Sequence, residues 1–329
     1  MQAIPRGRVQ SFCKHANSLR ICVAPIEARP RLGYENSTPA AMAHKPQGSS
    51  PMPNPRTTIA AALLVLAAPL QLALADTAKT DTSSPNLLTA AVAWRQTAAE
   101  YRALYYQGFN LAKLRLDQAL AERKPGARPP AIISDLDDTI LSSNSYWGAL
   151  LSQGKDFFDD ALWDRWVAAN GPTLTPGALD FLDYAKSRSV EIFYVSSRDQ
   201  GDRTDEYALN NLRNLKVPFA DKEHVTILRE SSNKEPAQKA IAERYDVLLM
   251  LGDNLNDFKR RYYVDDAKQR AALLDEDRAQ FGDRFILFPN PTDGHWMKAI
   301  FGESEPADTP ANRAKFRAAA TSGAWKGQD

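Results

Sequence analysis

The chain has 329 residues, of which 43% are hydrophobic and 25% charged, the proportions of a globular protein rather than of a disordered or collagen-like one. Its formal charge of +1 argues against a nucleic acid polymer as partner. Only two cysteines, Cys13 and Cys22, and four histidines are present, which excludes a disulfide scaffold and disfavours a Cys- or His-rich metal site.

Residues 57–75 form a nearly uncharged apolar run that follows Arg56 and ends in Ala73-Leu74-Ala75. This order of a positive residue, an apolar core and an A-x-A site is typical of a secretory signal peptide. A membrane span is the alternative, but it needs about 20 apolar residues, and Pro69 interrupts this run. We therefore predict cleavage near Ala75, no stable membrane anchor after cleavage, and a periplasmic or secreted protein.

Residues 1–51 show no periodic pattern, and translation from Met42 or Met52 would explain why they precede a signal peptide. We interpret residues 1–75 as an N-terminal extension plus a cleaved signal peptide, and residues 76–329 as one domain. That domain has 33 basic and 38 acidic residues and no cysteine, so packing must stabilise it. A domain of this length can bury an ample core.

A polar segment, 76–85, precedes the first predicted helix. Apolar residues then recur at spacings of three, four or their multiples, which predicts one long helix. They are Trp94, Ala98, Tyr101, Tyr105, Ala112, Leu116 and Leu120. Lys124-Pro125-Gly126 should end this helix. Farther along, an aromatic-rich stretch covers 142–190, and Thr175-Pro176-Gly177 opens a helix that ends near Arg188.

Short apolar runs of the buried-strand type alternate with helical patterns. The runs are 131–134, 191–196, 246–252 and 284–289, with 225–228 as a further candidate. This alternation predicts a Rossmann-like α/β fold, in which helices cover both faces of a parallel sheet. Ligands of such sheets bind beyond the carboxyl ends of the strands, so the residues there are the candidates for chemistry.

Two carboxylates, Asp135 and Asp137, follow the first run in the sequence D-L-D-D-T. Like charges this close repel each other, and a divalent cation would relieve the repulsion. An aspartate can also attack phosphorus and form an aspartyl-phosphate. Ser196 ends the second run, where its hydroxyl could donate to a phosphoryl oxygen.

Lys234 lies at the expected start of a helix, where its charge and the helix N–H groups would favour a phosphate. Asp253 and Asp257 follow a later run in G-D-N-L-N-D, and their hard oxygen ligands suit Mg²⁺. Each motif alone is weak evidence. Their order, each after an apolar strand, is what indicates a phosphate-handling site.

This ordered set resembles the haloacid dehalogenase (HAD) superfamily of phosphohydrolases, and Asp137 indicates a phosphatase. From about Trp94 to Trp296 the chain is similar to bacterial class C acid phosphatases, and more narrowly to the 5′-nucleotidase, lipoprotein e(P4) family. The stretches that carry this resemblance are AEYRALYYQGFNLAK (99–113), SDLDDTILSSNSYWG (134–148), WDRWV (163–167), FYVSSRD (193–199), LGDNLNDF (251–258) and FPNPTDGHW (288–296).

The resemblance implies a Mg²⁺-dependent phosphomonoesterase of the cell envelope, an acid phosphatase of 5′-nucleotidase type acting on small phosphomonoesters. It implies Asp135 as nucleophile, Asp137 as acid and base, and Ser196 and Lys234 as phosphate-binding residues. Lys239 fits the lysine position less well. The implied metal ligands are Asp135, Asp137 through its backbone carbonyl, Asp253 and, in support, Asp257.

The predicted substrate-binding residues are Arg198, Phe158 and Asp293. Phe158 matches one of the two aromatics expected to stack on a nucleobase. Asp293 replaces the Tyr of a P-N-P-x-Y-G-x-W segment, which weakens the expectation of nucleotide preference. The signal also lacks the cysteine that lipoproteins carry at the cleavage site.

The predicted architecture has a small helical roof, formed before the first strand and after Thr139, and no large cap. The sequence leaves open a homodimer and two alternatives in function. One is a non-catalytic envelope protein that binds or stores a ligand on the same fold. The other is a phosphatase for sugar phosphates, which Asp293 favours.

Overall fold

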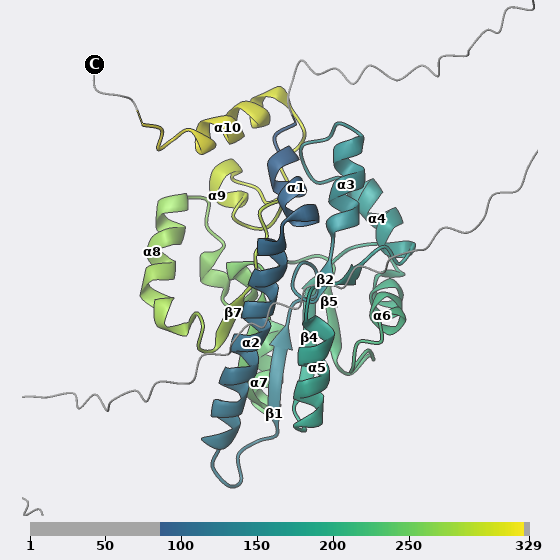
Figure 1. Ribbon diagram of the computed structural model, residues 1–329, viewed down its shortest axis with the longest axis vertical. Helices are drawn as coiled ribbons and strands as arrows, with labels where there is room; N and C mark the ends of the chain where they lie inside the picture. Colours follow the sequence, from purple (N-terminus) through teal and green to yellow (C-terminus); the bar gives the residue numbers. More distant parts are fainter. Residues whose placement is uncertain (1–85, 326–329) are drawn as a thin grey trace, which may run out of the picture. The chain divides into compact units, whose positions relative to one another are not determined.

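The computed structural model describes residues 86–325, which belong to one compact unit of the chain (Figure 1). The predicted extension and signal peptide, residues 1–75, and the polar segment that follows them lie outside the described residues. Within 86–325, no helix has the length and apolar character needed to cross a membrane.

Five parallel strands form the central sheet in the order β5-β4-β1-β6-β7. Their bounds are β1 Pro130–Ser134, β4 Glu191–Ser197, β5 Val225–Leu228, β6 Asp246–Gly252 and β7 Phe285–Leu287. All five lie on apolar runs that the sequence indicated, and the predicted parallel α/β sheet is confirmed. β1 is the central strand, so the residues that follow it lie in the middle of the sheet edge.

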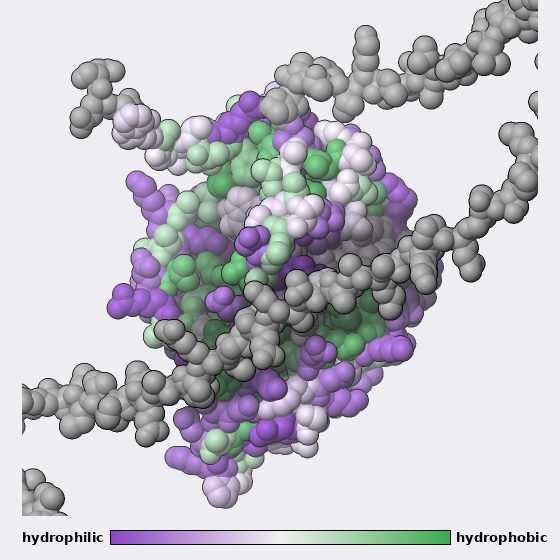
Figure 2. Space-filling view, in the orientation of Figure 1, coloured by the Kyte–Doolittle hydropathy of each residue, from purple (hydrophilic) through white to green (hydrophobic). Residues whose placement is uncertain are grey.

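Helices cover both faces of the sheet, and the alternation of side chains along β1 shows why. Ile132 packs with Ile192 against helices α2 (Ala99–Ala121) and α5 (Ala178–Ser187) on one face. Ile133 packs with Phe193 towards helix α7 (Glu235–Arg244) on the other face. Apolar residues are therefore needed at successive positions, as the continuous runs indicated. Figure 2 shows mostly hydrophilic residues around the lower ends of α2 and α5, which face solvent.

The helices occupy about half of the remaining described chain. Their bounds are α1 Thr89–Thr97, α2 Ala99–Ala121, α3 Asn144–Ser152, α4 Asp160–Ala168, α5 Ala178–Ser187, α6 Thr204–Asn214, α7 Glu235–Arg244, α8 Ala267–Asp277, α9 Lys298–Phe301 and α10 Pro310–Ala320. The predicted long helix is two helices, because Ala98 has an extended backbone between them, with ψ of 128°. The break separates α1, which packs on α3, from α2, which packs on the sheet.

The roof, residues 143–172, contains α3 and α4 and lies above the carboxyl end of β1 (Figure 1). Its core is a cluster that includes Tyr146, Trp147 and Trp163. A two-stranded antiparallel pair, β2 Leu141–Ser142 and β3 Thr173–Leu174, joins the two ends of the roof. The predicted small helical roof is thus present, and no large cap domain occurs among the described residues.

Candidate active site at the carboxyl ends of the strands

A pocket of about 410 Å³ opens beyond the carboxyl ends of β1, β4 and β6, beneath the roof. All nine predicted site residues line it: Asp135, Asp137, Phe158, Ser196, Arg198, Lys234, Asp253, Asp257 and Asp293. Lys239, the weaker lysine candidate, is exposed on α7 and does not line this pocket.

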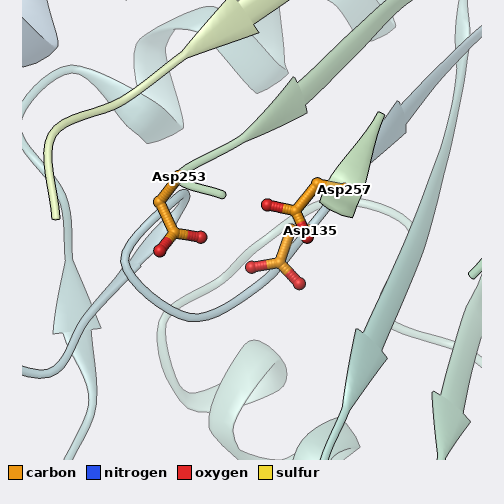
Figure 3. Close-up of side chains that lie close together, drawn as sticks. All are labelled: Asp135, Asp253 and Asp257. Atoms are coloured by element: carbon orange, nitrogen blue, oxygen red, sulfur yellow. The ribbon is translucent and has the colours of Figure 1, made fainter. Parts of the chain in front are cut away.

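Three of the carboxylates meet at one point of the pocket. Oxygens of Asp135, Asp253 and Asp257 lie within 4.8 Å of one another, and Figure 3 shows the three side chains converging. Burial, and then repulsion by Asp257 and Asp135, raises the pKa of Asp253 well above its usual range. A set of hard oxygen ligands with unfavourable mutual repulsion fits a divalent cation such as Mg²⁺.

Lys234 connects this cluster to the amino end of α7. Its ammonium donates to Asp135 and, at 2.7 Å, to Oδ1 of Asp257. Although burial opposes it, the charges of Asp135 and Asp257 raise the pKa of Lys234, so the amine stays protonated. A buried permanent cation beside Asp135 is positioned to neutralise an incoming phosphoryl group.

Asp257 is fixed by a tight turn after β6. Its Oδ2 accepts a hydrogen bond of 2.8 Å from the backbone N–H of Asn254, within a reciprocal capping box. The side chain lies so close to Gly252 that a Cβ at that position would collide with it. The glycine of the G-D-N-L-N-D motif is therefore required for the approach of this carboxylate.

Asp137 lies apart from the three-carboxylate cluster and is held by Arg198. Nε and Nη2 of Arg198 each donate to one carboxylate oxygen of Asp137, both at 2.6 Å, and Nη1 donates to Asn211 at 3.0 Å. The Arg198 side chain is fully buried, whereas 21% of the Asp137 side chain is exposed. Burial raises the pKa of Asp137 and Arg198 opposes this rise. The guanidinium of Arg198 thus donates its hydrogen bonds to Asp137 and Asn211 within the protein. Substrate binding by Arg198 stays a prediction.

Ser196 ends the buried part of β4, with 2% of the residue exposed, and it lines the pocket. The next strand along the sheet, β1, delivers Asp135 to the same edge. A residue with a hydroxyl donor and the candidate nucleophile thus follow neighbouring strands, an arrangement that suits the binding of a phosphoryl group.

A buried network beneath the site escaped the sequence-based analysis. Asp138, which has a left-handed backbone with φ of 54°, accepts hydrogen bonds from Arg95 and, at 2.7 Å, from the Ser143 hydroxyl. The Tyr105 hydroxyl donates to the Asp138 carbonyl at 2.6 Å. Asn290 connects this network to the cluster, since its amide donates to Asp253 at 2.8 Å. These contacts hold the loop that carries Asp135 and Asp137.

The remainder of the pocket, called here the far end, is lined by residues of the roof and of the segment 293–305. Phe158 is partly exposed and packs against Tyr146 and Trp163, with ring centroids 5.3 Å apart in both pairs. Asp293 and Glu305 lie on the other segment, and Asp160 lies at the start of α4. Burial, and then the charges of Glu305 and Asp138, raises the pKa of Asp293 from 3.8 to about 7.

Comparison with known proteins agrees with this geometry. Residues 57–296 match the family model described as HAD superfamily, subfamily IIIB (acid phosphatase). The chain is also similar to a solved class C acid phosphatase from Bacillus anthracis with tungstate bound, at 34% identity and a TM-score of 0.65. A second structure of the class C acid phosphatase from that organism has a sequence identity of 33% and a TM-score of 0.64. Each alignment covers 73% of this chain and 97% of the other.

Proposed function

The chain belongs to the subfamily IIIB acid phosphatases of the HAD superfamily, and from this premise we propose that it hydrolyses small phosphate monoesters through an aspartyl-phosphate on Asp135. One observation carries the proposal. A carboxylate at the end of the central strand is bonded to a buried lysine and lies among two further carboxylates. The neighbouring hydroxyl of Ser196 completes a set of groups that suits a phosphoryl group.

The proposed cofactor is Mg²⁺, which Asp135, Asp253 and Asp257 would hold through their side chains and Asp137 through its backbone carbonyl. Bound there, the ion would polarise the phosphoryl group and offset its negative charge. Asn290 and Lys234 restrain Asp253 and Asp257 by hydrogen bonds of 2.8 and 2.7 Å, so the ligand set is preorganised.

In the first half of the reaction, a carboxylate oxygen of Asp135 forms a bond to phosphorus while the bond from phosphorus to the alcohol oxygen breaks. Lys234 and Ser196 bind the equatorial oxygens, where negative charge is concentrated. Asp137 donates a proton to the departing alkoxide and is left ionised. The two hydrogen bonds from Arg198 then stabilise this ionised form.

In the second half, Asp137 removes a proton from a water molecule that attacks the phosphorus of the aspartyl-phosphate. The bond from phosphorus to Asp135 breaks, inorganic phosphate leaves, and both aspartates regain their initial states. Arg198 fixes the orientation of Asp137 in both halves, because a guanidinium that donates two parallel bonds restricts rotation of the carboxylate.

The substrate range and location are proposed at a coarser level. Phe158 supports stacking of a nucleobase, and Asp293 disfavours it, so 5′-nucleotides and sugar phosphates are both candidates. Export to the periplasm or the exterior rests on the apolar run at 57–75. N-terminal sequencing of the exported protein should give Asp76 as the first residue.

The deciding experiment is a substrate screen of the purified protein with Mg²⁺, using an aryl phosphate, 5′-nucleotides and sugar phosphates. We expect phosphate release that stops in excess chelator, returns with Mg²⁺ and is inhibited competitively by tungstate. Undiminished activity in chelator would contradict the metal assignment. Binding of these esters without any turnover would support the alternative of a non-catalytic binding protein.

A further inference from the structure

Carboxylates line both ends of the pocket, and the cations Lys234 and Arg198 lie among those at the strand ends. The carboxylates of Asp160, Asp293 and Glu305, called here the acidic wall, line the far end. Within residues 86–325, no lysine, arginine or histidine nitrogen forms a salt bridge to any of the three. By contrast, Arg229 on the rim is already paired with Asp199 at 3.1 Å. Asp160 and Glu305 are exposed and Asp293 is half-buried, and none of the three forms an ion pair within the described residues.

The nearest histidine does not supply the missing charge. His295 lines the same pocket and accepts or donates a hydrogen bond of 2.8 Å with the Ser304 hydroxyl. Burial, followed by the charge of Lys234, lowers the pKa of His295 to about 3, so the ring is neutral at ordinary pH. Asp293 in turn has a pKa near 7, because burial and the charge of Glu305 oppose its ionisation. A cation entering with the ligand would relieve this repulsion.

An aromatic surface lies in the same pocket. Trp147 and Trp163 line it but are 2% and 8% exposed, whereas Phe158 is partly exposed and presents its ring. Stacking of a nucleobase between two aromatic rings needs two accessible rings, and Phe158 supplies one of them. An aromatic face beside carboxylates is, however, the combination that binds alkylated ammonium groups, through cation–π attraction and charge.

We propose that this pocket selects phosphate monoesters whose alcohol carries an ammonium group, with the cation between Phe158 and the acidic wall. The proposal rests on the proposed function, since it names the alcohol released in the same reaction. It also explains why Lys234 and Arg198 lie at the strand ends and no cation is paired with the acidic wall, because such a substrate is anionic at the phosphate and cationic at the other end. Nucleoside diphosphates and triphosphates would instead bring additional negative charge towards Asp293 and Glu305.

The test compares two esters of the same shape and different charge. Phosphocholine carries a trimethylammonium group, and 3,3-dimethylbutyl phosphate has carbon in place of that nitrogen. We expect kcat/KM of the wild-type protein to be at least about tenfold higher for phosphocholine, from the combined cation–π and carboxylate attraction. A ratio near one, or a higher kcat/KM for adenosine 5′-monophosphate than for phosphocholine, would overturn the proposal.

Variants assign the effect to the named groups. Asp293→Asn combined with Glu305→Gln should bring the ratio of the two esters close to one, and Phe158→Leu should lower it about threefold or more. The matched control is Glu303→Gln, which removes an exposed carboxylate two residues from Glu305 that does not line the pocket. This control should keep the wild-type ratio. An equal loss of preference in Glu303→Gln would show a general effect of net charge and refute the assignment.

An aryl phosphate separates failure of this inference from failure of the proposed function. Hydrolysis of 4-nitrophenyl phosphate with no preference between the paired esters refutes the inference alone. If no ester is hydrolysed, the proposed function fails, and the paired compounds are then compared as ligands by calorimetry. Tighter binding of phosphocholine, lost in the Asp293→Asn and Glu305→Gln double variant, would still support a cation site, whereas equal binding would refute it.

Discussion

The two ends of the pocket differ in how their carboxylates are held. At the strand ends, Asp135 and Asp257 share the ammonium of Lys234, and Asp137 is bonded twice to Arg198. At the far end, Asp293 and Glu305 have no such partner in the described chain. The paired end is equipped to repeat one reaction with fixed geometry. The carboxylates of the unpaired end form no ion pair within the described protein, and it is there that we propose the alcohol of the substrate is recognised.

The largest effect is expected at the paired end, from Asp135→Asn. An amide cannot form the aspartyl-phosphate, so kcat should fall by more than about 10⁴-fold. Rapid quenching with a ³²P-labelled monoester should trap phosphoenzyme in the wild type and none in the variant. Asp246→Asn is the control, because that carboxylate lies at the opposite end of β6 and pairs with Arg123. Phosphoenzyme in Asp135→Asn would place the nucleophile elsewhere.

The next effect concerns proton transfer by Asp137. Asp137→Asn removes the donor but leaves Asp135 and the backbone carbonyl in place, so hydrolysis of alkyl phosphates should slow by about 10²–10⁴-fold. Aryl esters should lose much less, because their leaving groups need little protonation. Steady-state kcat on one alkyl and one aryl ester measures the contrast.

Arg198→Lys tests whether the two hydrogen bonds to Asp137 are needed for proton transfer, because lysine retains the positive charge and loses the paired bonds. It should reproduce the contrast between alkyl and aryl esters at smaller size. Equal losses on both esters in Asp137→Asn would instead assign Asp137 to metal binding or folding.

A stability effect of intermediate size is expected beneath the paired end. Arg95→Met leaves the carboxylate of Asp138 buried without its ion pair, which should lower the free energy of unfolding by about 3–5 kcal/mol. Urea denaturation measures this difference. The control is Arg115→Met, whose partner Asp283 is 3.5 Å away at the surface, and which should cost less than about 1 kcal/mol. Similar losses in both variants would show that the Arg95–Asp138 pair has no special role.

The smallest effect is expected at the unpaired end, from Asp293→Asn. The folded-state pKa of Asp293, about 7, exceeds its ordinary value of 3.8, so between these pH values the folded protein holds a proton that the unfolded chain has lost. The free energy of unfolding therefore falls as pH rises from about 4 to 7. An asparagine at position 293 does not titrate, so the variant lacks this dependence on pH. The variant should gain at least about 1 kcal/mol more, relative to wild type, at pH 8 than at pH 4. Parallel pH profiles of thermal unfolding would contradict this.

The sequence predicted the paired end well because strand periodicity and short spacing determine it. Asp135 and Asp137 follow β1 directly, Asp253 and Asp257 follow β6, and parallel strands bring these ends to one edge. The pocket collects all of these predicted residues.

Long-range contacts could not be predicted in this way. In the sequence, Arg95 is indistinguishable from other charged residues on the solvent face of an amphipathic helix. The break at Ala98 and the packing of α1 on α3 bring its side chain to Asp138. The helical stripe gave no indication of that break, since Ala98 fits it. Asp293 was singled out by comparison with a motif, but its proximity to Glu305 arises from the path of the chain through the short helix α9 and the turns on either side of it, which no periodic pattern in the sequence indicates.

The antiparallel pair of β2 and β3 gives the roof a common entrance and exit. Leu141 faces Leu174 and Ser142 faces Thr173, so the chain leaves the sheet and returns to it at one place. An insertion whose chain ends meet at one place can be exchanged for another of different length without altering the register of β1 and β4. Transplanting residues 144–172 from a relative, with the packing of α3 on α1 retained, would therefore change the wall that carries Phe158 while keeping the bond from Ser143 to Asp138 and the reaction centre. The roof is in this sense a replaceable module. Exchange of the roof would change which substrates the same hydrolytic site accepts, both during evolution and in protein engineering.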